Sequence, residues 1–199
     1  MSTKSITGTL TEKNIVDAYI GESIAYTRYT FYARQAEKDG YYPISEIFKE
    51  TADNELQHSK VFFKMLQGGK VAPTGSPIDA GVIGDTASNL ATAAAEELAE
   101  GVEQYRKAAV VAREEGFDEI AGHFEAIAEV EMRHRERFML MLKQVQDDTV
   151  WKRDHEIYWK CLECGYIFKG TEPPQSCFAC DHPSRHYMAC DLDELLGIG

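Results

Sequence analysis

The most informative stretch of this chain is residues 127–138, IAEVEMRHRERF, in which Glu131 and His134 stand three positions apart. Both belong to a stripe of mostly apolar side chains that advances in alternating steps of four and three residues. The stripe consists of Ile120, Phe124, Ile127, Glu131, His134, Phe138, Met141 and Val145. It is typical of the inner face of a bundle helix, where burying a charged group costs several kcal/mol unless something compensates the charge.

Residues 51–62, TADNELQHSKVF, repeat this arrangement with Glu55 and His58. A single Glu-x-x-His match means little in a chain with 33 Asp and Glu residues. Two matches, each in register with an apolar stripe, indicate a common cause. Carboxylate oxygens and imidazole nitrogens suit iron or manganese, so we expect bound metal ions to compensate the buried charges.

Two further helical segments each place an acidic residue in the predicted core. Glu22 is the acidic member of the stripe in the first segment, and Glu97 continues the apolar face of another. One Glu from each of two helices plus Glu-x-x-His from each of the other two is the ligand set of ferritin-like di-iron proteins. We therefore expect two metal ions inside a four-helix bundle. His123 fits no second ligand pattern and is predicted to be an ordinary side chain.

Four cysteines near the C-terminus form two C-x-x-C pairs: Cys161, Cys164, Cys177 and Cys180. Four thiolates can hold one tetrahedral metal ion, either zinc or a single iron. Gly165 and Asp181 follow the two pairs, and both residue types tolerate the left-handed backbone that turns N–H groups towards sulfur. Disulfides are not expected, because no signal peptide precedes the chain and the sequence looks intracellular. Cys190 has no partner at this spacing and is predicted to pack as a small apolar side chain.

The apolar periodicity and the turn residues predict two domains, residues 1–149 and residues 150–199. The first contains helices over residues 10–39, from 43 to 68, from 85 or 86 to 116, and from 118 to about 147. Expected N-terminal caps are Thr9 (with Glu12 in a capping box), either Asp85 or Thr86, and Asp118. The Gly- and Pro-rich residues 68–84 are long enough for a crossover between the second and third helices. The second domain is a linker followed by a cysteine module too small to fold without its metal.

The charge of the chain excludes some classes of function. The sequence has 33 Asp and Glu against 21 Lys and Arg, a formal net charge of −12. No basic stripe is available to contact nucleic acid. No apolar run is long enough to span a bilayer. We expect a soluble, cytoplasmic protein whose bound cations offset part of its negative charge.

Five segments of this sequence resemble the rubrerythrin family. They are Gly-Glu22-Ser, Asn-Glu55-Leu-Gln-His58, Glu97-Leu-Ala-Glu100, Ala-Glu129-Val-Glu131-Met-Arg-His134, and Cys161-Leu-Glu-Cys164-Gly-Tyr with its partner pair. Glu100 discriminates this family from other ferritin-like proteins, because rubrerythrins carry an additional Glu one turn beyond the third-helix ligand. The resemblance implies a mainly α fold. A ferritin-like four-helix bundle with two irons would be followed by a small rubredoxin-like domain with one iron, for which zinc is possible.

The resemblance also implies a role for each ligand of the bundle. Glu55 and Glu131 would bridge the two irons. Glu22 would bind one iron, and Glu97 and His134 would bind the other.

Two exchanging ligands and two supporting tyrosines complete the implied site. Glu100 would share the first iron with Glu22, and His58 would replace Glu100 when the iron is reduced. Tyr29 and Tyr105 would hydrogen-bond to ligand carboxylates. Phe178 departs from the proline that the family usually has after the first cysteine of the second pair, which leaves the ligand set intact.

The activity that the resemblance implies is the reduction of hydrogen peroxide to water in defence against oxidative stress. A flavoprotein NAD(P)H reductase or rubredoxin would deliver electrons singly to the iron held by the four cysteines, and the family implies a head-to-tail homodimer or a larger assembly. Two alternatives remain open. One is a ferritin-like protein that oxidises or stores iron and carries a structural zinc ribbon, and the other is a non-enzymatic scaffold stabilised by metal.

Overall fold

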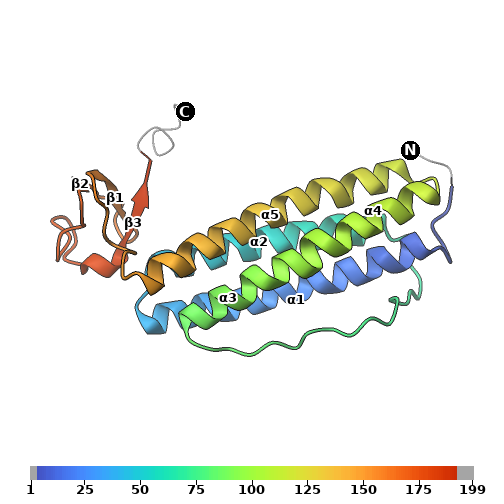
Figure 1. Cartoon of the computed structure of the whole chain (residues 1–199), viewed down its shortest axis with the longest axis horizontal. Helices are drawn as coiled ribbons and strands as arrows, with labels where there is room; N and C mark the ends of the chain where they lie inside the picture. Colours follow the sequence, from blue (N-terminus) through green and yellow to red (C-terminus); the bar gives the residue numbers. More distant parts are fainter. Residues whose placement is uncertain (1–3, 192–199) are drawn as a thin grey trace.

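A computed structural model describes residues 4–191 of the chain, without the side chain of Glu100. Its helices are α1 (Leu10–Asp39), α2 (Tyr42–Met65), α3 (Thr86–Glu96), the π-helical segment η1 (Glu97–Gln104), α4 (Tyr105–Glu114) and α5 (Asp118–Gln146). The segments α3, η1 and α4 follow one another without a break. The bundle therefore has four rods, with a small sheet at one end (Figure 1). The predicted mainly α fold, a four-helix bundle followed by a small metal-ribbon domain, is confirmed.

Local capping explains where α1 begins and ends. The Thr9 side chain accepts a hydrogen bond from the Glu12 N–H at 3.1 Å. The Glu12 carboxylate in turn accepts a hydrogen bond from the Gly8 N–H at 2.9 Å. Gly8 lies one residue before Thr9, whose N–H would be the donor in a standard capping box. Gly40 ends the helix with a φ of 88°, a left-handed conformation that glycine adopts without strain. Both ends of this helix are as predicted.

The other helices differ from the predictions mainly at their ends. Of the two caps predicted for the third helix, Asp85 is confirmed: it accepts from the Ser88 N–H at 2.8 Å, and Thr86 is the first helical residue. The predicted cap at Asp118 is wrong, because Phe117 occupies that position and makes no side-chain cap. Asp118 lies instead in the first turn, where its charge still favours the helix N-terminus. Helix α2 ends at Met65, before residues 68–69, where its end was predicted.

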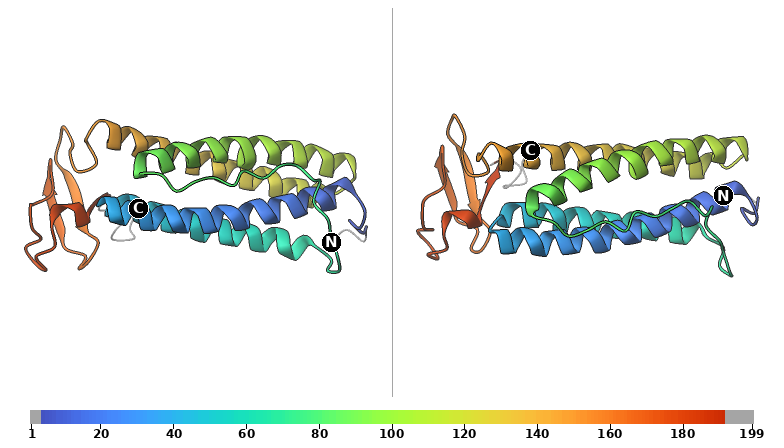
Figure 2. Two further views of the ribbon diagram at one scale, coloured as in Figure 1. Left: turned by 90° about the horizontal axis from the view of Figure 1, so that it is seen from below. Right: turned by 60° about the horizontal axis from the view of Figure 1, so that its bottom comes forward.

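The crossover between α2 and α3, residues 66–85, runs along the outside of the bundle beside α1 (Figure 2). It has no regular secondary structure. Three side chains of α1 hold it through its backbone. Arg28 and Tyr32 donate to carbonyl groups at 2.6 and 3.0 Å, and Asp17 accepts from an N–H at 3.0 Å.

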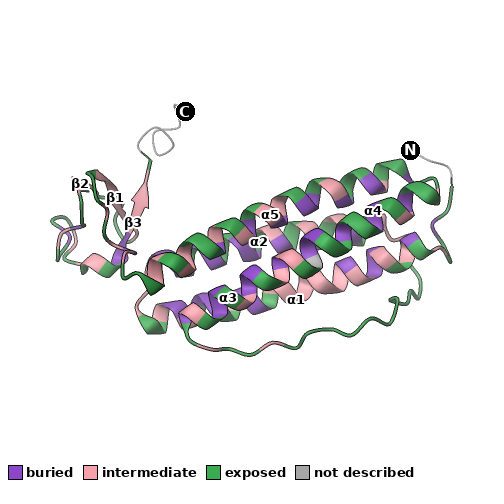
Figure 3. Cartoon of the chain, viewed as in Figure 1, coloured by how far each residue is buried: buried purple, intermediate pink, exposed green. Residues whose placement is uncertain are grey.

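The bundle core consists of two apolar clusters at different heights along the axis, each drawing on all four rods. One contains Ile15, Phe62, Tyr105 and Phe124, and the other contains Tyr29, Phe48, Leu90 and Phe138. Between these positions each rod contributes the acidic or histidine residues of its stripe. Most of these residues are buried like the apolar core around them and His58 is half-buried, whereas the outward faces of the rods are exposed (Figure 3).

The C-terminal module is an antiparallel sheet with strand order β2-β1-β3. Its elements are β1 (Ile157–Cys161), β2 (Ile167–Gly170), the 3₁₀ turn η2 (Ser184–His186) and β3 (Tyr187–Cys190). The module packs on the α1–α2 turn: the rings of Tyr42 and His186 stack with centroids 3.8 Å apart, and those of Tyr41 and Trp151 stack at 5.7 Å. Within residues 4–191, no helix combines the length and hydropathy needed to cross a membrane.

Candidate metal centres

The first candidate metal position lies where α1, α2 and α5 meet. Glu22, Glu55, His58 and Glu131 offer ligand atoms that all lie within 4.8 Å of one another. The Nδ1 atom of His58 is 2.8 Å from Glu131 Oε1, 3.0 Å from Glu55 Oε2 and 3.6 Å from Glu22 Oε2. The i, i+3 spacing places Glu55 and His58 on one face of α2, so both side chains reach the same point.

The second position lies beside the first and is built in the same way. Glu55, Glu97, Glu131 and His134 again bring their ligand atoms within 4.8 Å of one another. The Nδ1 atom of His134 is 2.7 Å from Glu131 Oε2 and 3.0 Å from Glu55 Oε1. Glu55 and Glu131 therefore direct one carboxylate oxygen towards each position, so each would be able to hold two metal ions at once.

The donor atoms of this cluster fit metal ions better than they fit one another. Glu55 Oε1, both carboxylate oxygens of Glu131, and His134 Nδ1 are buried and have no hydrogen-bond partner among the residues described. The short contacts of His134 thus lack hydrogen-bond geometry. A buried polar atom left unpaired costs about 1–3 kcal/mol. Two cations would satisfy all of these atoms, and two divalent ions would balance the four buried carboxylates.

The pKa shifts in the cluster also indicate that the buried carboxylates favour positive charge beside them. Burial, with repulsion from Glu55 and Glu131, raises the pKa of Glu22 well above its usual value. Burial disfavours the charged form of His58, but the close carboxylates of Glu131, Glu22 and Glu55 outweigh burial and raise the His58 pKa to about 12. Burial likewise disfavours the charged form of His134, but the close carboxylates of Glu131 and Glu55 outweigh burial and raise the His134 pKa to about 9. In the absence of cations, protons take up charge that metal ions would otherwise supply.

Two buried tyrosines orient the carboxylates that are not shared. Tyr29 Oη donates to Glu97 Oε1 at 2.6 Å, and Tyr105 Oη donates to Glu22 Oε1 at 2.6 Å. Burial and the neighbouring carboxylates raise the pKa of both phenols, so both remain protonated donors. Each bond holds one carboxylate oxygen, which fixes the orientation of the other.

The π-helical segment η1 supplies the candidate ligand of the third rod. It begins at Glu97 and contains Gly101, which packs directly against Glu131. A Cβ atom on Gly101 would lie 2.5 Å from Glu131 Cγ and 2.6 Å from Glu131 Cβ, closer than real contacts allow. Glycine is therefore required here for the shared ligand to reach its place. The side chain of Glu100, in the same segment, lies outside the described part of the chain.

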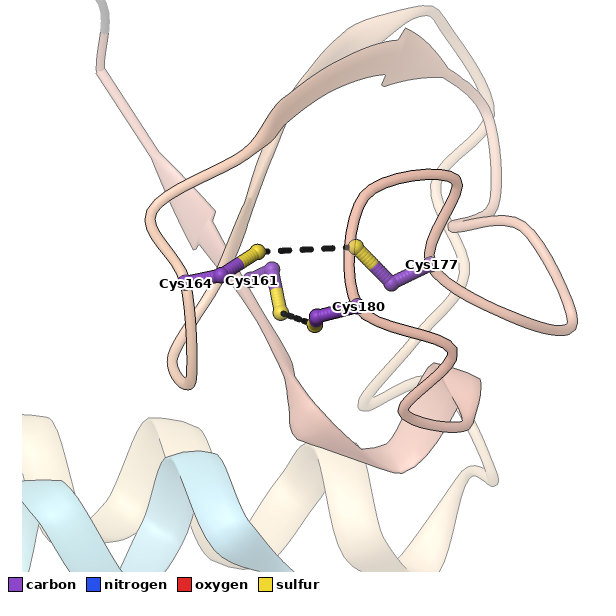
Figure 4. Close-up of side chains that lie close together, drawn as sticks. All are labelled: Cys161, Cys164, Cys177 and Cys180. Carbon is purple, nitrogen blue, oxygen red and sulfur yellow. Dashed lines mark hydrogen bonds between the residues drawn. The ribbon is translucent and has the colours of Figure 1, made fainter.

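The four cysteines of the C-terminal module converge on a single point (Figure 4). The Sγ atoms of Cys161 and Cys180 are 3.7 Å apart, as are those of Cys164 and Cys177. The residues after the two pairs, Gly165 and Asp181, have φ values of 77° and 60°. These left-handed turns are as predicted, and they let backbone N–H groups approach the sulfurs.

The thiols of this quartet cannot all ionise easily without a cation. Burial raises the pKa of Cys177, but the nearby Tyr187 hydroxyl and backbone N–H groups outweigh burial and lower it to about 6. The N–H of His182 favours the Cys180 thiolate, whereas burial and the other sulfurs raise the Cys180 pKa to about 12. One thiolate forms readily and further ones are opposed. A tetrahedral iron or zinc ion relieves this opposition and suits four sulfur ligands.

Comparison with known proteins agrees with both centres. The family model described as Rubrerythrin matches residues 13–143, and the one described as Rubrerythrin, rubredoxin-like domain matches residues 159–188. A rubrerythrin of Porphyromonas gingivalis is 46% identical, with 92% of each chain covered. A rubrerythrin of Nitratidesulfovibrio vulgaris is 44% identical, with 98% of each covered. This chain belongs to the rubrerythrin family.

Solved structures support the same assignment. A fully reduced, all-ferrous nigerythrin has a TM-score of 0.62 at 28% identity, covering 95% of this chain and 90% of that one. A bacterioferritin of Mycobacterium tuberculosis has a TM-score of 0.60 at 17% identity, covering 69% of this chain and 86% of that one, and shares the bundle fold. The carboxylate–histidine cluster and the cysteine quartet match the metal complement of the family: two irons in the bundle, and one iron or zinc held by cysteine.

The structure also places two residues that the sequence patterns left out of the metal sites, and it shows two supporting residues that the patterns missed. His123 is exposed on α5 and outside both metal clusters, and Cys190 is partly buried on β3 outside the quartet. The patterns missed Gly101 and also Asn54, whose Nδ2 is 3.3 Å from His134 Nε2. Asn54 contacts the ring nitrogen that faces away from the metal position, where a second contact fixes the orientation of a ligating imidazole.

Proposed function

We propose that this rubrerythrin-family chain is a peroxidase that reduces hydrogen peroxide to water at its di-iron centre. Electrons would reach that centre one at a time through iron held by the cysteine quartet. The observation that supports this most is the charge balance of the buried cluster. Four carboxylates with two neutral imidazoles balance two ferrous ions, so the centre is suited to hold both ions in the reduced state until substrate arrives.

Each residue of the cluster has a part in this proposal. Two irons bound there would supply the two electrons that, with two protons, convert one hydrogen peroxide into two waters. Glu55 and Glu131 keep the two positions together, each through both of its oxygens. We assign Glu100 as a further carboxylate that replaces His58 at the first position on oxidation. An anion in place of a neutral ligand would offset the added positive charge.

The access to the centre suits a small substrate. A cavity of about 100 Å³ is lined by Glu22, Glu97, Gly101 and Tyr105 and extends to the polar side chain of Gln104 at the surface. A site for one water needs roughly 10–15 Å³ on the same measure, so this space admits hydrogen peroxide. The carboxylates and the phenol in its wall can pass the two protons that the reaction consumes.

The position of the cysteine quartet bears on assembly. Its module touches the bundle at Tyr42, and His58 lies 16 residues further along α2. At 1.5 Å per residue this is about 24 Å, which makes the chain's own bundle centre a poor electron acceptor. We therefore propose a head-to-tail homodimer, in which the quartet of one chain reduces the bundle centre of the other. A flavoprotein NAD(P)H reductase or rubredoxin would reduce the quartet.

The test combines metal analysis with turnover. Purified protein should be red from ferric tetrathiolate, contain iron in both centres, and consume peroxide when coupled to a reductase. Glu55→Ala combined with Glu131→Ala should abolish consumption, whereas Glu129→Ala, at an exposed position on the same helix, should not. A colourless protein with zinc in the quartet and no peroxide consumption would instead favour the iron-storing or scaffold alternatives.

A further inference from the structure

Tyr187 lies closer to the cysteine quartet than its position in the sequence suggests. It opens β3 and pairs with Cys161 across the β1–β3 ladder. Its side chain is 0% exposed, in an apolar cluster with Trp159, Cys161 and Cys177. The phenol ring therefore forms part of the wall that encloses the sulfurs.

The hydroxyl of Tyr187 is a polar group buried in this apolar cluster. Its oxygen is buried and has no partner of standard hydrogen-bond geometry within residues 4–191. Phenylalanine would fill the same volume without the roughly 1–3 kcal/mol that an unpaired hydroxyl costs. Cys161 and Cys177, two members of the quartet, pack in the same cluster as Tyr187. Burial and the neighbouring thiols, Cys177 foremost, raise the pKa of the Tyr187 hydroxyl, so it stays a protonated donor.

We infer that the Tyr187 hydroxyl donates a hydrogen bond to the Cys177 thiolate in the iron-loaded quartet and thereby raises the reduction potential of that centre. Such a bond stabilises negative charge on sulfur. The ferrous form of the centre carries one more negative charge than the ferric form, so the bond stabilises the reduced form more. Tyr187 is thus a tuning residue for the electron-transfer step, which rests on the role proposed above for the quartet.

The Tyr187 hydroxyl differs from the other hydrogen-bond donors near the sulfurs. Backbone N–H groups of Ala179 and Cys180 also favour the Cys177 thiolate, but they come from the turn that the C-x-x-C pair itself forms. Nδ1 of His182 is 3.4 Å from Cys180 Sγ, on a partly exposed ring. The Tyr187 hydroxyl is a fully buried side-chain donor, so one substitution can remove it while keeping the ring and the turn.

The test is the reduction potential of the quartet in the full-length Tyr187→Phe protein, reconstituted with iron and titrated under anaerobic conditions. The equilibrium constant for reduction should fall about tenfold, which is 59 mV for a one-electron couple. The sulfur-to-iron absorption bands should move to lower energy, because the sulfur orbitals lose a stabilising bond. Tyr166→Phe is the matched control, because Tyr166 is 36% exposed and packs on Phe178; it should leave both unchanged.

A second measurement keeps the inference testable if the Phe variant loses iron. Replacing tyrosine biosynthetically by 3-fluorotyrosine makes the phenol a stronger donor, so the potential should rise, and the change should be the same in the Tyr166→Phe background. An unchanged potential in the iron-loaded Tyr187→Phe protein, or in the fluorinated protein, would overturn the inference. The proposed function would then still stand. If zinc proved to be the native metal of the quartet, the proposed electron-transfer function would fail. The test of Tyr187 would still apply, because it uses protein reconstituted with iron.

Discussion

Gly101 and Glu131 show how little space the bundle leaves around its shared ligands. Gly101→Ala places a methyl group 2.5 Å from Glu131 Cγ, so either the carboxylate or the η1 backbone must move. We expect loss of iron from the bundle centre, with a destabilisation of about 1–3 kcal/mol from overpacking. Iron per chain, measured by mass spectrometry beside helical content, checks this.

The control for this variant is Gly122→Ala. Gly122 lies on α5, and a methyl group added there would have no neighbouring atom within 4 Å, so this substitution should keep both irons. Full iron content in Gly101→Ala would mean that the close approach does not hold Glu131 in place.

The ligands themselves could be predicted from the sequence, whereas their close supports could not. Glu55 and Glu131 each stand three positions before a histidine inside an apolar stripe, and helical periodicity alone puts such pairs on one face. The need for glycine at Gly101 arises from contact with another rod, which no local pattern reveals. Asn54 was missed for the same reason, since its partner His134 lies on α5.

Glu115 connects two helices at the end of the bundle away from the sheet. From beyond the end of α4 its carboxylate accepts hydrogen bonds from the hydroxyl and N–H of Thr11 and the N–H of Leu10, in the first turn of α1. Glu115→Ala should lower the free energy of unfolding by about 1 kcal/mol, as the loss of a helix cap does. Urea unfolding at neutral pH measures this, with the exposed neighbour Glu114→Ala as the control.

The effect of Glu115 should also depend on pH. Its bonds from Thr11, which outweigh burial, lower the pKa of Glu115 below its usual value. A carboxylate with a lowered folded-state pKa stabilises the fold above its unfolded pKa, about 4.3, and loses that contribution as pH falls through the folded value. The difference between wild type and Glu115→Ala should therefore shrink in acid. A difference independent of pH would show that the charge of Glu115 is not involved.

Helix ends could be predicted where a local cap sets them, as at Thr9, Gly40 and Asp85. The π-helical segment η1 could not. Its sequence, ELAEGVEQ, contains ordinary helix-forming residues, and the wider turn is a matter of how the rod packs around the centre. The predicted cap at Asp118 failed because a carboxylate suits both the cap and the first turn, and only the backbone conformation distinguishes them.

At the scale of the whole molecule, we propose that residues 1–149 and 150–199 are units with separate metal ligands. Cys164→Ser should therefore lose the metal of the quartet and leave the tail sensitive to protease, because metal binding supplies most of the folding free energy of so small a module. The bundle should keep its irons. Limited proteolysis with metal analysis checks both points, and Cys190→Ser, outside the quartet, serves as the control. A protease-resistant tail in Cys164→Ser would mean that metal does not fold it.

The proposed assembly predicts complementation between inactive chains. One parent lacks the bundle irons (Glu55→Ala with Glu131→Ala), and the other lacks the quartet metal (Cys161→Ser with Cys164→Ser). Mixed dimers should recover reductase-dependent peroxide consumption that neither parent shows, because one subunit supplies each centre. Inactive mixtures, despite confirmed subunit exchange, would mean that electrons travel within one chain.

The most direct measurement is rapid mixing of the fully reduced protein, prepared without oxygen, with hydrogen peroxide and, in a separate experiment, with dioxygen. We expect one peroxide to remove two electrons from the bundle centre, to react faster than dioxygen, and to be followed by the red colour of the quartet as its iron is oxidised in turn. The outcome that would contradict a peroxidase is a bundle centre that reacts faster with dioxygen than with peroxide and leaves the quartet unchanged.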